Sequence, residues 1–179
     1  MPHFAISVIG RDRPGIVAAV AACLLNHGAN IEDSQSTILR GHFSMTLIVA
    51  TAEGADEAAL RADVERVARE LRLEAATVSA VADTDPAEPV VPTHIVTVYG
   101  TDHPGIVNAV ATALAGLEVN ITDLNTRLVG DGEGQDLYAM MLEIALPPGL
   151  DSDALEGLLS ATRREQGVEV TVREVGEEP

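Results

Sequence analysis

The chain has 179 residues, enough for one ordinary domain or two small ones, and 46 % of them are apolar. Its 28 Asp and Glu residues against 11 Lys and Arg residues give a formal net charge of −17, which opposes contact with the phosphate backbones of nucleic acids. Because two Phe, two Tyr and no Trp leave few rings on which bases can stack, we expect an aliphatic core and no direct binding of nucleic acid.

The cysteine content and the N-terminal residues limit other classes of protein. Cys23 is the sole cysteine, so no disulfide can form within the chain, and its setting VAACLL predicts a buried thiol on a helix. The first ten residues, MPHFAISVIG, lack a basic segment followed by a long apolar stretch, so they predict a first strand rather than a signal peptide. No apolar run reaches the ~20 residues that cross a membrane. We therefore expect a cytoplasmic protein without membrane contact.

The first half of the chain predicts strand, helix, strand, strand, helix, strand. Residues 3–9 (HFAISVI) are apolar and β-branched, as in a strand, and residues 14–25 then show apolar positions at helical spacing before Gly28. Residues 40–42 (RGH) are a hairpin signal between two further strands, 30–39 and 43–50. A second helix over 60–71 and a last strand over 73–81 complete the order.

The second half of the chain repeats the first. GRDRPGIV (residues 10–17) and GTDHPGIV (residues 100–107) agree at six of eight letters, at an offset of 90. After GDGEG (130–134) the offset becomes 95, so the second copy carries a five-residue insertion. We expect its strands near 93–99, 118–129, 136–146 and 167–174, and its helices near 104–116 and 151–165.

Between the copies lies DTDPAEPVVP (83–92), whose three prolines predict an extended, stiff linker. The domains are therefore expected at 1–82 and 93–179. The order βαββαβ predicts an α+β, ferredoxin-like fold in each copy, in which two helices cover one face of a four-stranded antiparallel sheet. The other face of the sheet must be polar or covered. Asp33, Gln35 and Thr37 alternate along the second strand and so lie on one face of it, and part of this face is expected to be exposed to solvent.

The repeated phrase lies where the first strand of each copy meets the first helix. Asp12 is placed to cap this helix and Pro14 to occupy its first turn, so a well-made helix start is enough to explain the phrase alone. The alternative is that the free N–H groups and the positive end of the helix dipole bind a small carboxylate beside Gly15. Asn30, at the start of the next strand, suits either a turn or a hydrogen bond to an amino-acid ligand.

These residues resemble the ACT domain, a family of small regulatory modules that bind amino acids. D-x-P-G-I-V follows a strand and N-I opens the next strand, and the resemblance covers residues 3–81 and 93–175. Two such domains in tandem resemble the glycine cleavage system transcriptional repressor and its relatives. The resemblance implies that domains pair side by side with ligand at the seam. The residues implied are Asp12, Arg13, Pro14, Gly15, Ile16, Asn30 and Ile31, and in the second copy Asp102, His103, Pro104, Gly105, Ile106, Asn120 and Ile121.

The resemblance also implies a function and partners. We expect a regulatory protein that senses a small amino acid of the glycine or serine class. It would act on amino-acid or one-carbon metabolism, or on its transcription, through a protein partner such as a transcriptional activator or an enzyme. Bare sheet edges favour a homodimer. The rival interpretations are an ACT scaffold that binds no ligand and a regulatory subunit of a metabolic enzyme. In the alignment of the two copies, Arg13 corresponds to His103 and Glu32 to Thr122. The resemblance therefore does not imply that both copies bind a ligand equally.

Catalysis is not expected from these residues. The chain has no Gly-rich phosphate loop, and Cys23 has no partner that the sequence identifies. The family's catalytic members carry a separate catalytic domain, for which no residues remain here. We therefore expect no enzyme activity, no cofactor and no metal site. The histidines form neither H-E-x-x-H nor another ligand spacing; they are His3, His27, His42, His94 and His103.

Overall fold

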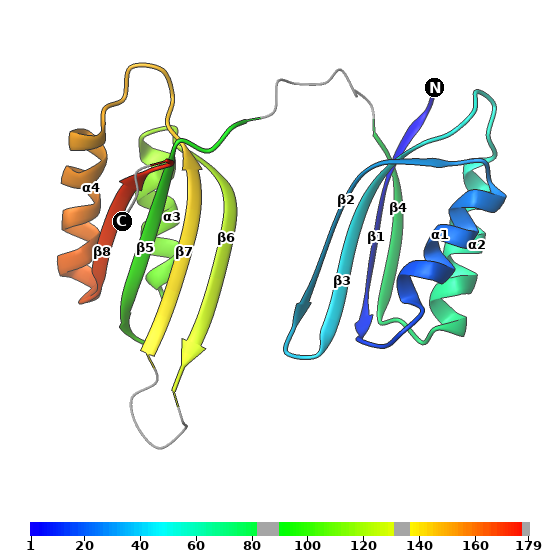
Figure 1. The fold of residues 1–179 in the computed structure, drawn as a ribbon, viewed down its shortest axis with the longest axis horizontal. Coiled ribbons are helices and arrows are strands. Elements are labelled where there is room, and N and C mark those ends of the chain that lie inside the picture. Colours follow the sequence, from blue (N-terminus) through cyan, green and yellow to red (C-terminus); the bar gives the residue numbers. More distant parts are fainter. Residues whose placement is uncertain (82–89, 131–136, 177–179) are drawn as a thin grey trace. The chain divides into compact units, whose positions relative to one another are not determined.

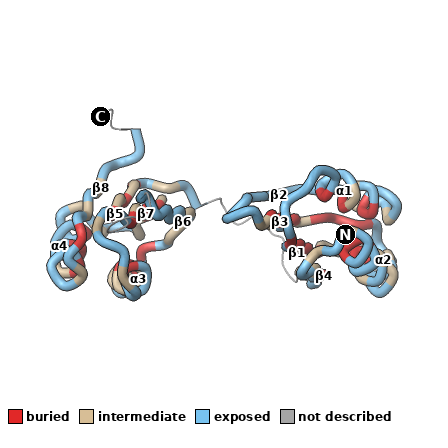
Figure 2. The backbone as a smooth tube through the Cα atoms, turned by 90° about the horizontal axis from the view of Figure 1, so that it is seen from below, coloured by how far each residue is buried: buried red, intermediate tan, exposed pale blue. Residues whose placement is uncertain are grey.

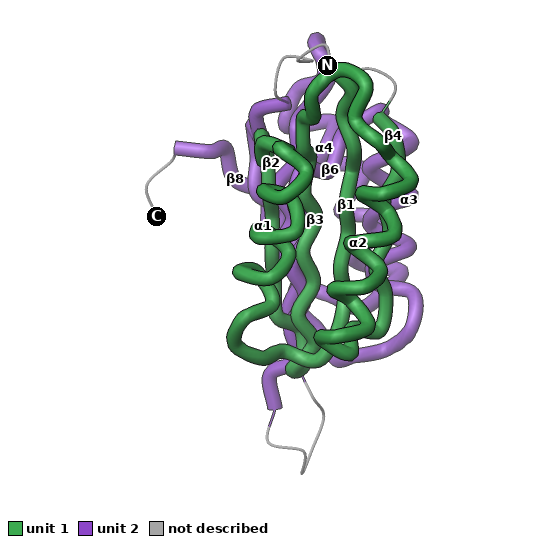
Figure 3. The backbone as a smooth tube through the Cα atoms, turned by 90° about the vertical axis from the view of Figure 1, so that its right-hand side faces the viewer, with its two compact units in different colours: residues 1–86 green, residues 87–179 purple. Residues whose placement is uncertain are grey.

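A computed structural model describes residues 1–81, 90–130 and 137–176. Two compact units are present, Met1–Pro86 (unit 1) and Ala87–Pro179 (unit 2), and Figure 3 colours them separately. Residues 83–89 of the expected linker lie outside the described residues, and so do residues 131–136, which hold most of the insertion. The linker and the domain boundaries therefore stay predictions.

Each unit is a four-stranded antiparallel sheet with two helices on one face (Figure 1). The strand order is β2-β3-β1-β4 in unit 1 and β6-β7-β5-β8 in unit 2, which confirms the predicted βαββαβ fold. The elements of unit 1 are β1 (His3–Arg11), α1 (Ile16–Asn26), β2 (Asn30–Leu39), β3 (His42–Ala50), α2 (Glu57–Glu70) and β4 (Ala75–Val81). Those of unit 2 are β5 (His94–Thr101), α3 (Ile106–Gly116), β6 (Asn120–Val129), β7 (Leu137–Ala145), α4 (Ser152–Gln166) and β8 (Glu169–Glu174).

The core of each unit lies between the sheet and its helices, where Figure 2 shows the buried residues. Alternate residues of β1 point inward, and α1 meets them with a stripe at i, i+4 and i+8, because strands and helices present side chains with those periods. The inward side chains are Phe4, Ile6 and Val8 on β1 and Ile16, Val20 and Leu24 on α1. The core is mainly aliphatic, as predicted, although it also takes in Phe4, Phe43 and Tyr138. Each fully buried Leu or Ile contributes about 1.5–3 kcal/mol relative to exposure.

Two sequence predictions about individual features also have an outcome. Cys23 is buried on α1, as predicted, and burial raises the pKa of its thiol above the ordinary value. Within residues 1–81, 90–130 and 137–176, none of the helices combines the length and the apolar character that a membrane span requires.

The first glycine of each repeated phrase is required by packing. A Cβ on Gly10 would lie 2.8 Å from Leu73 Cδ2 and 3.0 Å from Leu73 Cα, and one on Gly100 would lie 2.7 Å from Val168 Cγ1. Leu73 and Val168 follow α2 and α4 in the chain. The end of the first strand and the segment that leaves the second helix therefore approach too closely to admit a side chain.

We expect Gly100→Ala to lower the free energy of unfolding by about 1–3 kcal/mol, because the added methyl group overpacks this contact. The control is Gly157→Ala inside α4, where a Cβ meets no atom within 4 Å. That change is expected to raise stability by about 0.5–1 kcal/mol through helix propensity. Urea denaturation of both variants measures the difference, and equal effects of the two changes would contradict the packing requirement.

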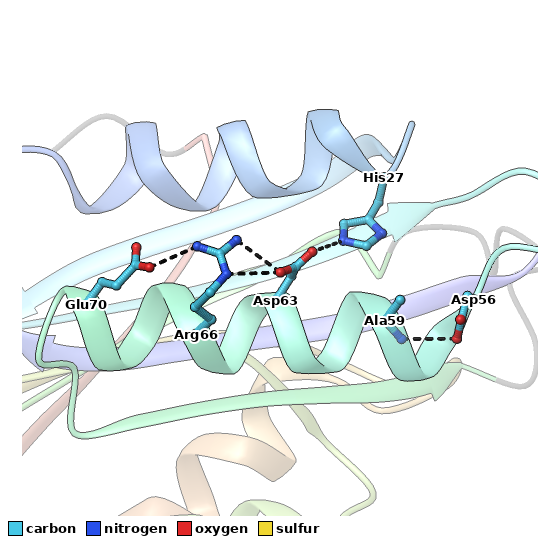
Figure 4. A network of polar contacts seen from close by, with 6 residues as sticks. All are labelled: His27, Asp56, Ala59, Asp63, Arg66 and Glu70. Atoms are coloured by element: carbon cyan, nitrogen blue, oxygen red, sulfur yellow. Dashed lines mark hydrogen bonds and ion pairs between the residues drawn. The ribbon is translucent and has the colours of Figure 1, made fainter.

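A polar network fastens the end of α1 to α2 (Figure 4). His27 Nε2, at the C-terminal end of α1, lies 2.9 Å from Asp63 Oδ2, and Arg66 donates from Nη2 to Asp63 Oδ1 at 3.0 Å. Arg66 Nη1 also donates to Glu70 Oε1 at 3.0 Å. The hydrogen bonds from His27, and then those from Arg66, hold the pKa of Asp63 below its ordinary value.

We expect the Asp63 carboxyl group to titrate below pH 3.8, its ordinary pKa. Because the folded-state pKa is lowered, the stabilising contribution is present above 3.8 and is lost as the pH falls through the folded-state pKa. His27→Ala should move the pKa of Asp63 upward, whereas His42→Ala, which removes a histidine paired with Glu74, should leave it unchanged. NMR titration of the side-chain carboxyl signal measures both, and equal shifts in the two variants would refute the assignment to His27.

Candidate functional site

The β1–α1 loop (12–15) and the β5–α3 loop (102–105) hold the centre of the repeated phrase. The helices begin at Ile16 and Ile106, after glycines in the left-handed region, with φ +98° at Gly15 and +108° at Gly105. No side chain caps either helix. The predictions that Asp12 caps α1 and that Pro14 lies in its first turn are therefore wrong. The glycine adopts a left-handed conformation that other residues rarely adopt, and the helix begins only after it, two residues beyond the proline.

The N-termini of α2 and α4, in contrast to those of α1 and α3, are capped by side chains. The carboxylate of Asp56 accepts a hydrogen bond from Ala59 N at 3.0 Å at the start of α2, and Asp151 accepts one from Ala154 N at 2.9 Å at the start of α4. Both helices also carry an acidic residue in the first turn, which α1 and α3 lack. The first-turn N–H groups and the positive dipole ends of α1 and α3 are thus left without a carboxylate cap from the chain, as an anion site requires.

In unit 2 the loop borders an open hollow of about 620 Å³. Sequence reasoning missed Asn108 and Tyr138 here. The signal for Tyr138 was its alignment with Phe43 at the offset of 95, which marks a hydroxyl group that unit 1 lacks. Burial raises the pKa of Tyr138, whose hydroxyl donates to Met140 Sδ at 3.8 Å. The hollow is lined by Asp102, His103, Pro104, Gly105, Ile106, Val107, Asn108, Ala111 and Tyr138.

The cations of the two loops are bound to the chain itself. Arg13 donates from Nη2 to the carbonyl oxygen of Leu71, at the C-terminal end of α2. His103 Nε2 lies 2.9 Å from the carbonyl oxygen of Gln166, the last residue of α4, and Nδ1 lies 3.1 Å from that of Pro104. These two carbonyls, Gln166 first, raise the pKa of His103. Both side chains therefore anchor their loop to the end of the second helix.

The structure does not bring Asn30 and Asn120 to the loop of their own unit. Asn30 pairs with Ala50, and Ala50 pairs with His3, the first residue of β1. The loop begins after the last residue of β1, eight residue steps away, which corresponds to about 26 Å along a strand. Asn120 occupies the same position at the start of β6. One unit therefore cannot hold a single ligand with both its loop and its asparagine.

One side of each unit presents an uncharged helix beside an unpaired strand edge. α1 (IVAAVAACLLN) and α3 (IVNAVATALAG) contain no charged residue, although Val17 is 52 % exposed and Leu25 is 75 % exposed. All ten residues of the edge strand β2 are exposed. A helix that is apolar all round is usually buried, and an open strand edge usually finds a partner. This side therefore exposes apolar side chains next to an open strand edge.

The histidines are engaged locally rather than gathered into a metal site. His3 pairs with Glu32 at 3.1 Å, and buried His94 lies 2.9 Å from Thr93 Oγ1 and 3.0 Å from Ser152 Oγ. Within residues 1–81, 90–130 and 137–176, no three His, Cys, Asp or Glu side chains form a cluster that could hold a metal ion.

Comparison with known proteins places this geometry in a family. The sequence profile of the ACT domain matches residues 3–77 and again residues 93–173. The chain belongs to the ACT domain family. The match covers both copies of the repeated phrase and confirms the resemblance on which the site residues were chosen. Proteins of this family are regulatory, bind amino-acid effectors in general and often form oligomers.

Individual relatives agree with this assignment. The UPF0237 protein MK1213 of Methanopyrus kandleri is 40 % identical over 72 residues, 40 % of this chain and 80 % of that protein. Phosphoserine phosphatase SerB2 of Mycobacterium tuberculosis is 29 % identical over 173 residues, which are 96 % of this chain but 40 % of that protein. This chain thus spans less than half the length of that relative.

Two solved structures share the tandem fold over nearly their whole length. An unknown protein from Galdieria sulphuraria has a TM-score of 0.76 and 30 % identity, over 97 % of this chain and 98 % of that one. A "putative glycine cleavage system transcriptional repressor" has a TM-score of 0.68 and 16 % identity, over 98 % of each chain. At that identity the second likeness concerns the fold alone.

We expect Asp56→Ala to lower the free energy of unfolding of unit 1 by about 1 kcal/mol, because it removes a helix cap. Asp12→Ala is expected to cost less than about 0.5 kcal/mol, since Asp12 is exposed and caps no helix. Urea denaturation of the two variants provides the comparison. A cost for Asp12→Ala as large as that for Asp56→Ala would restore the capping role that the structure denies.

Proposed function

We propose that the protein is a non-catalytic regulator that senses a small amino acid, whose carboxylate binds at the open N-terminus of α1 or α3. The observation that carries this proposal is the contrast within one chain between two helices capped by aspartate and two helices, both after the repeated phrase, that are left uncapped. Backbone N–H groups and the helix dipole at such an end favour a negative charge. The amino-acid effectors of the ACT family support the choice of ligand.

The site is completed, in this proposal, by a second copy of the unit from another chain. When two β2 strands pair antiparallel by their open edges, the start of one strand meets the end of the other. The end of β2 lies next to the loop, because Asp12 N donates to Gly41 O at 2.9 Å in the hairpin that follows β2. Asn30 of one copy then reaches the loop of its partner. The uncharged face of α1 supplies apolar surface for the same contact.

The residues of this composite site have separate tasks. The N–H groups after Gly15 take the ligand carboxylate, and the exposed carboxylate of Asp12 attracts the ammonium group. Asn30 of the paired copy hydrogen-bonds either group through its amide. Ile31 lies beside it in β2. Unit 2 offers the equivalent set with Asp102, Pro104, Gly105, Ile106, Asn120 and Ile121.

The biological setting follows from the family and from charge. We place the protein in the cytoplasm as a homodimer that responds to glycine or serine and acts on amino-acid or one-carbon metabolism, or on its transcription. Its net charge of −17 favours action through a protein, such as an activator or an enzyme, over contact with DNA. Domains at 1–82 and 93–179 joined by a stiff linker at 83–92 complete the proposed organisation.

The second candidate is an ACT scaffold or a regulatory subunit of a metabolic enzyme that binds no amino acid. The uncharged face of α1, exposed at Val17 and Leu25, favours it independently, since this face suits protein contact whether or not a ligand is present. A thermal-shift screen of the common amino acids separates the two candidates, because a ligand of the folded state raises the melting temperature. If no amino acid at millimolar concentration changed the melting temperature, the sensor proposal would fail and the scaffold would be the remaining candidate.

We expect Asn30→Ala and Asn120→Ala together to weaken amino-acid binding about tenfold or more, because a hydrogen bond to a charged group contributes roughly 1.5–3 kcal/mol. Stability should change by less than about 0.5 kcal/mol, as both side chains are exposed. Isothermal calorimetry and urea denaturation measure the two quantities. Unchanged affinity would remove the asparagines from the site.

Mixing two variants tests whether the site is shared between chains. Val17→Glu with Val107→Glu places a carboxylate on the first turn of α1 and α3, where it fills the open helix ends itself. As homodimers, this variant and the double asparagine variant should both bind ligand more weakly than the unaltered chain, the latter by about tenfold or more. In a mixed dimer one of every two equivalent sites joins an unaltered loop to an unaltered asparagine, so co-refolding the two at equal concentration should restore part of the binding. If light scattering finds dimers and no binding returns, the two-chain site is wrong.

A further inference from the structure

The residue between Asp and Pro is one of the two positions at which the copies of the repeated phrase differ. Arg13 aligns with His103 at the offset of 90, and their acceptors Leu71 and Gln166 align with each other at the offset of 95. Both cations therefore bind the same carbonyl position, at the C-terminal end of the second helix of their unit. The contact joins residues 58 apart in unit 1 and 63 apart in unit 2, so it ties together segments distant in the chain.

The hydrogen-bond partners of His103 define its protonation state. Its two ring nitrogens lie 2.9 Å from Gln166 O and 3.1 Å from Pro104 O, and both partners are carbonyl oxygens, which only accept. A neutral imidazole has one N–H group and can make only one of the two bonds. Both bonds form together only in the imidazolium. An arginine guanidinium, in contrast, has no neutral form in proteins, so its N–H groups donate without regard to pH.

We propose that Arg13 and His103 position their loops by binding the end of the second helix of their unit. In unit 1 this contact does not depend on pH, whereas in unit 2 the bonds of His103 to Gln166 O and to Pro104 O form together only while the imidazole is protonated. The loop that His103 holds leads directly into the uncapped first turn of α3. Loss of one of the two bonds on deprotonation therefore loosens the backbone N–H groups of that turn, whereas those of α1 keep their position. The tether itself does not depend on ligand binding; its consequence for a ligand rests on the proposed function.

The surroundings of His103 favour the charged form. The carbonyl end of α4 carries the negative end of the helix dipole, and the Asp102 carboxylate acts in the same direction. Arg163 and Arg164 are the cations in the last turn of α4, and Arg163 is paired with Glu169 of β8. On β7 the hollow presents Tyr138, whose raised pKa keeps it neutral in the range where histidine titrates.

The direction of the pH effect follows from the raised pKa of His103, whose ordinary value is 6.5. Because the folded state binds the proton more tightly than the unfolded state, both bonds of His103 are present below pH 6.5 and one of them is lost as the pH rises through the folded-state pKa. The loop of unit 2 is thus held by two bonds on the acid side and by one on the alkaline side. The loop of unit 1 has no such transition.

NMR of the full-length chain without ligand tests the tether directly. The imidazole signals of His103 should titrate above pH 6.5, and the amide signals of Gly105, Ile106 and Val107 should shift with the same midpoint. The amide signals of Gly15, Ile16 and Val17 should show no transition at this pH. A His103 midpoint at or below 6.5, or amide signals that do not follow it, would overturn the proposal.

Exchange of the two cations is the matched control. His103→Arg should abolish the transition in unit 2 while the loop keeps its low-pH signals, and Arg13→His should create a transition at residues 15–17. His103→Gln should hold the unit 2 loop in its high-pH state throughout. His42→Gln, which removes a histidine elsewhere, should change none of these signals. A transition that persists in His103→Arg would assign the effect to another group.

Binding measurements separate this proposal from the proposed function. Glycine and serine serve as probes in calorimetry across the same pH range. If they bind, His103→Arg should make the affinity of unit 2 independent of pH, and an unchanged pH profile would refute the link between tether and site. If neither binds, the proposed function fails, while the NMR result still decides whether the tether exists.

Discussion

The left-handed glycine at the end of each loop is the constraint on which the rest of the site depends. At φ +98° and +108°, Gly15 and Gly105 turn the chain just before α1 and α3, so these helices begin two residues after the proline. Asp12 consequently caps no helix. α2 and α4 start without such a turn, and each takes an ordinary aspartate cap. One backbone conformation therefore decides which helix ends are left open for an anion.

The loop is also held between helix ends of opposite sign. The first helix presents its positive N-terminus to the loop, while the second presents its negative carbonyl end, and Arg13 or His103 binds the latter. The close approach at Gly10 and Gly100 brings the end of the second helix near enough for this contact. The absence of a side chain at Gly10 and Gly100 thus allows the loop to lie between the two helix ends. The chain satisfies the negative helix end itself and leaves the positive one without a side-chain cap.

The sequence predicted the elements well because their signals are periodic and occur twice. All twelve elements lie within a few residues of their expected positions, and the copies support each other despite the insertion. The errors concern single residues. D-x-P-G looks the same whether aspartate caps a helix or a left-handed glycine precedes it. The distance of Asn30 from the loop of its own unit is not such an error, but it depends on strand register and so could not be derived from spacing. The contact of Arg13 with Leu71 spans 58 residues, so no local pattern announces it.

Duplication makes the differences between the copies easier to interpret than either copy alone. Most paired core positions keep their character, as Met45 and Met140 do, so the fold does not require the changes at the loop. Two of these changes fall on one hollow: the arginine position becomes His103, and the Phe43 position becomes Tyr138. His103 can lose a hydrogen bond on deprotonation, whereas Arg13 at the same position in unit 1 cannot. Tyr138 adds a hydroxyl group that Phe43 lacks. Two units of the same fold, with the same open helix end, thus have loops whose positions respond differently to protons.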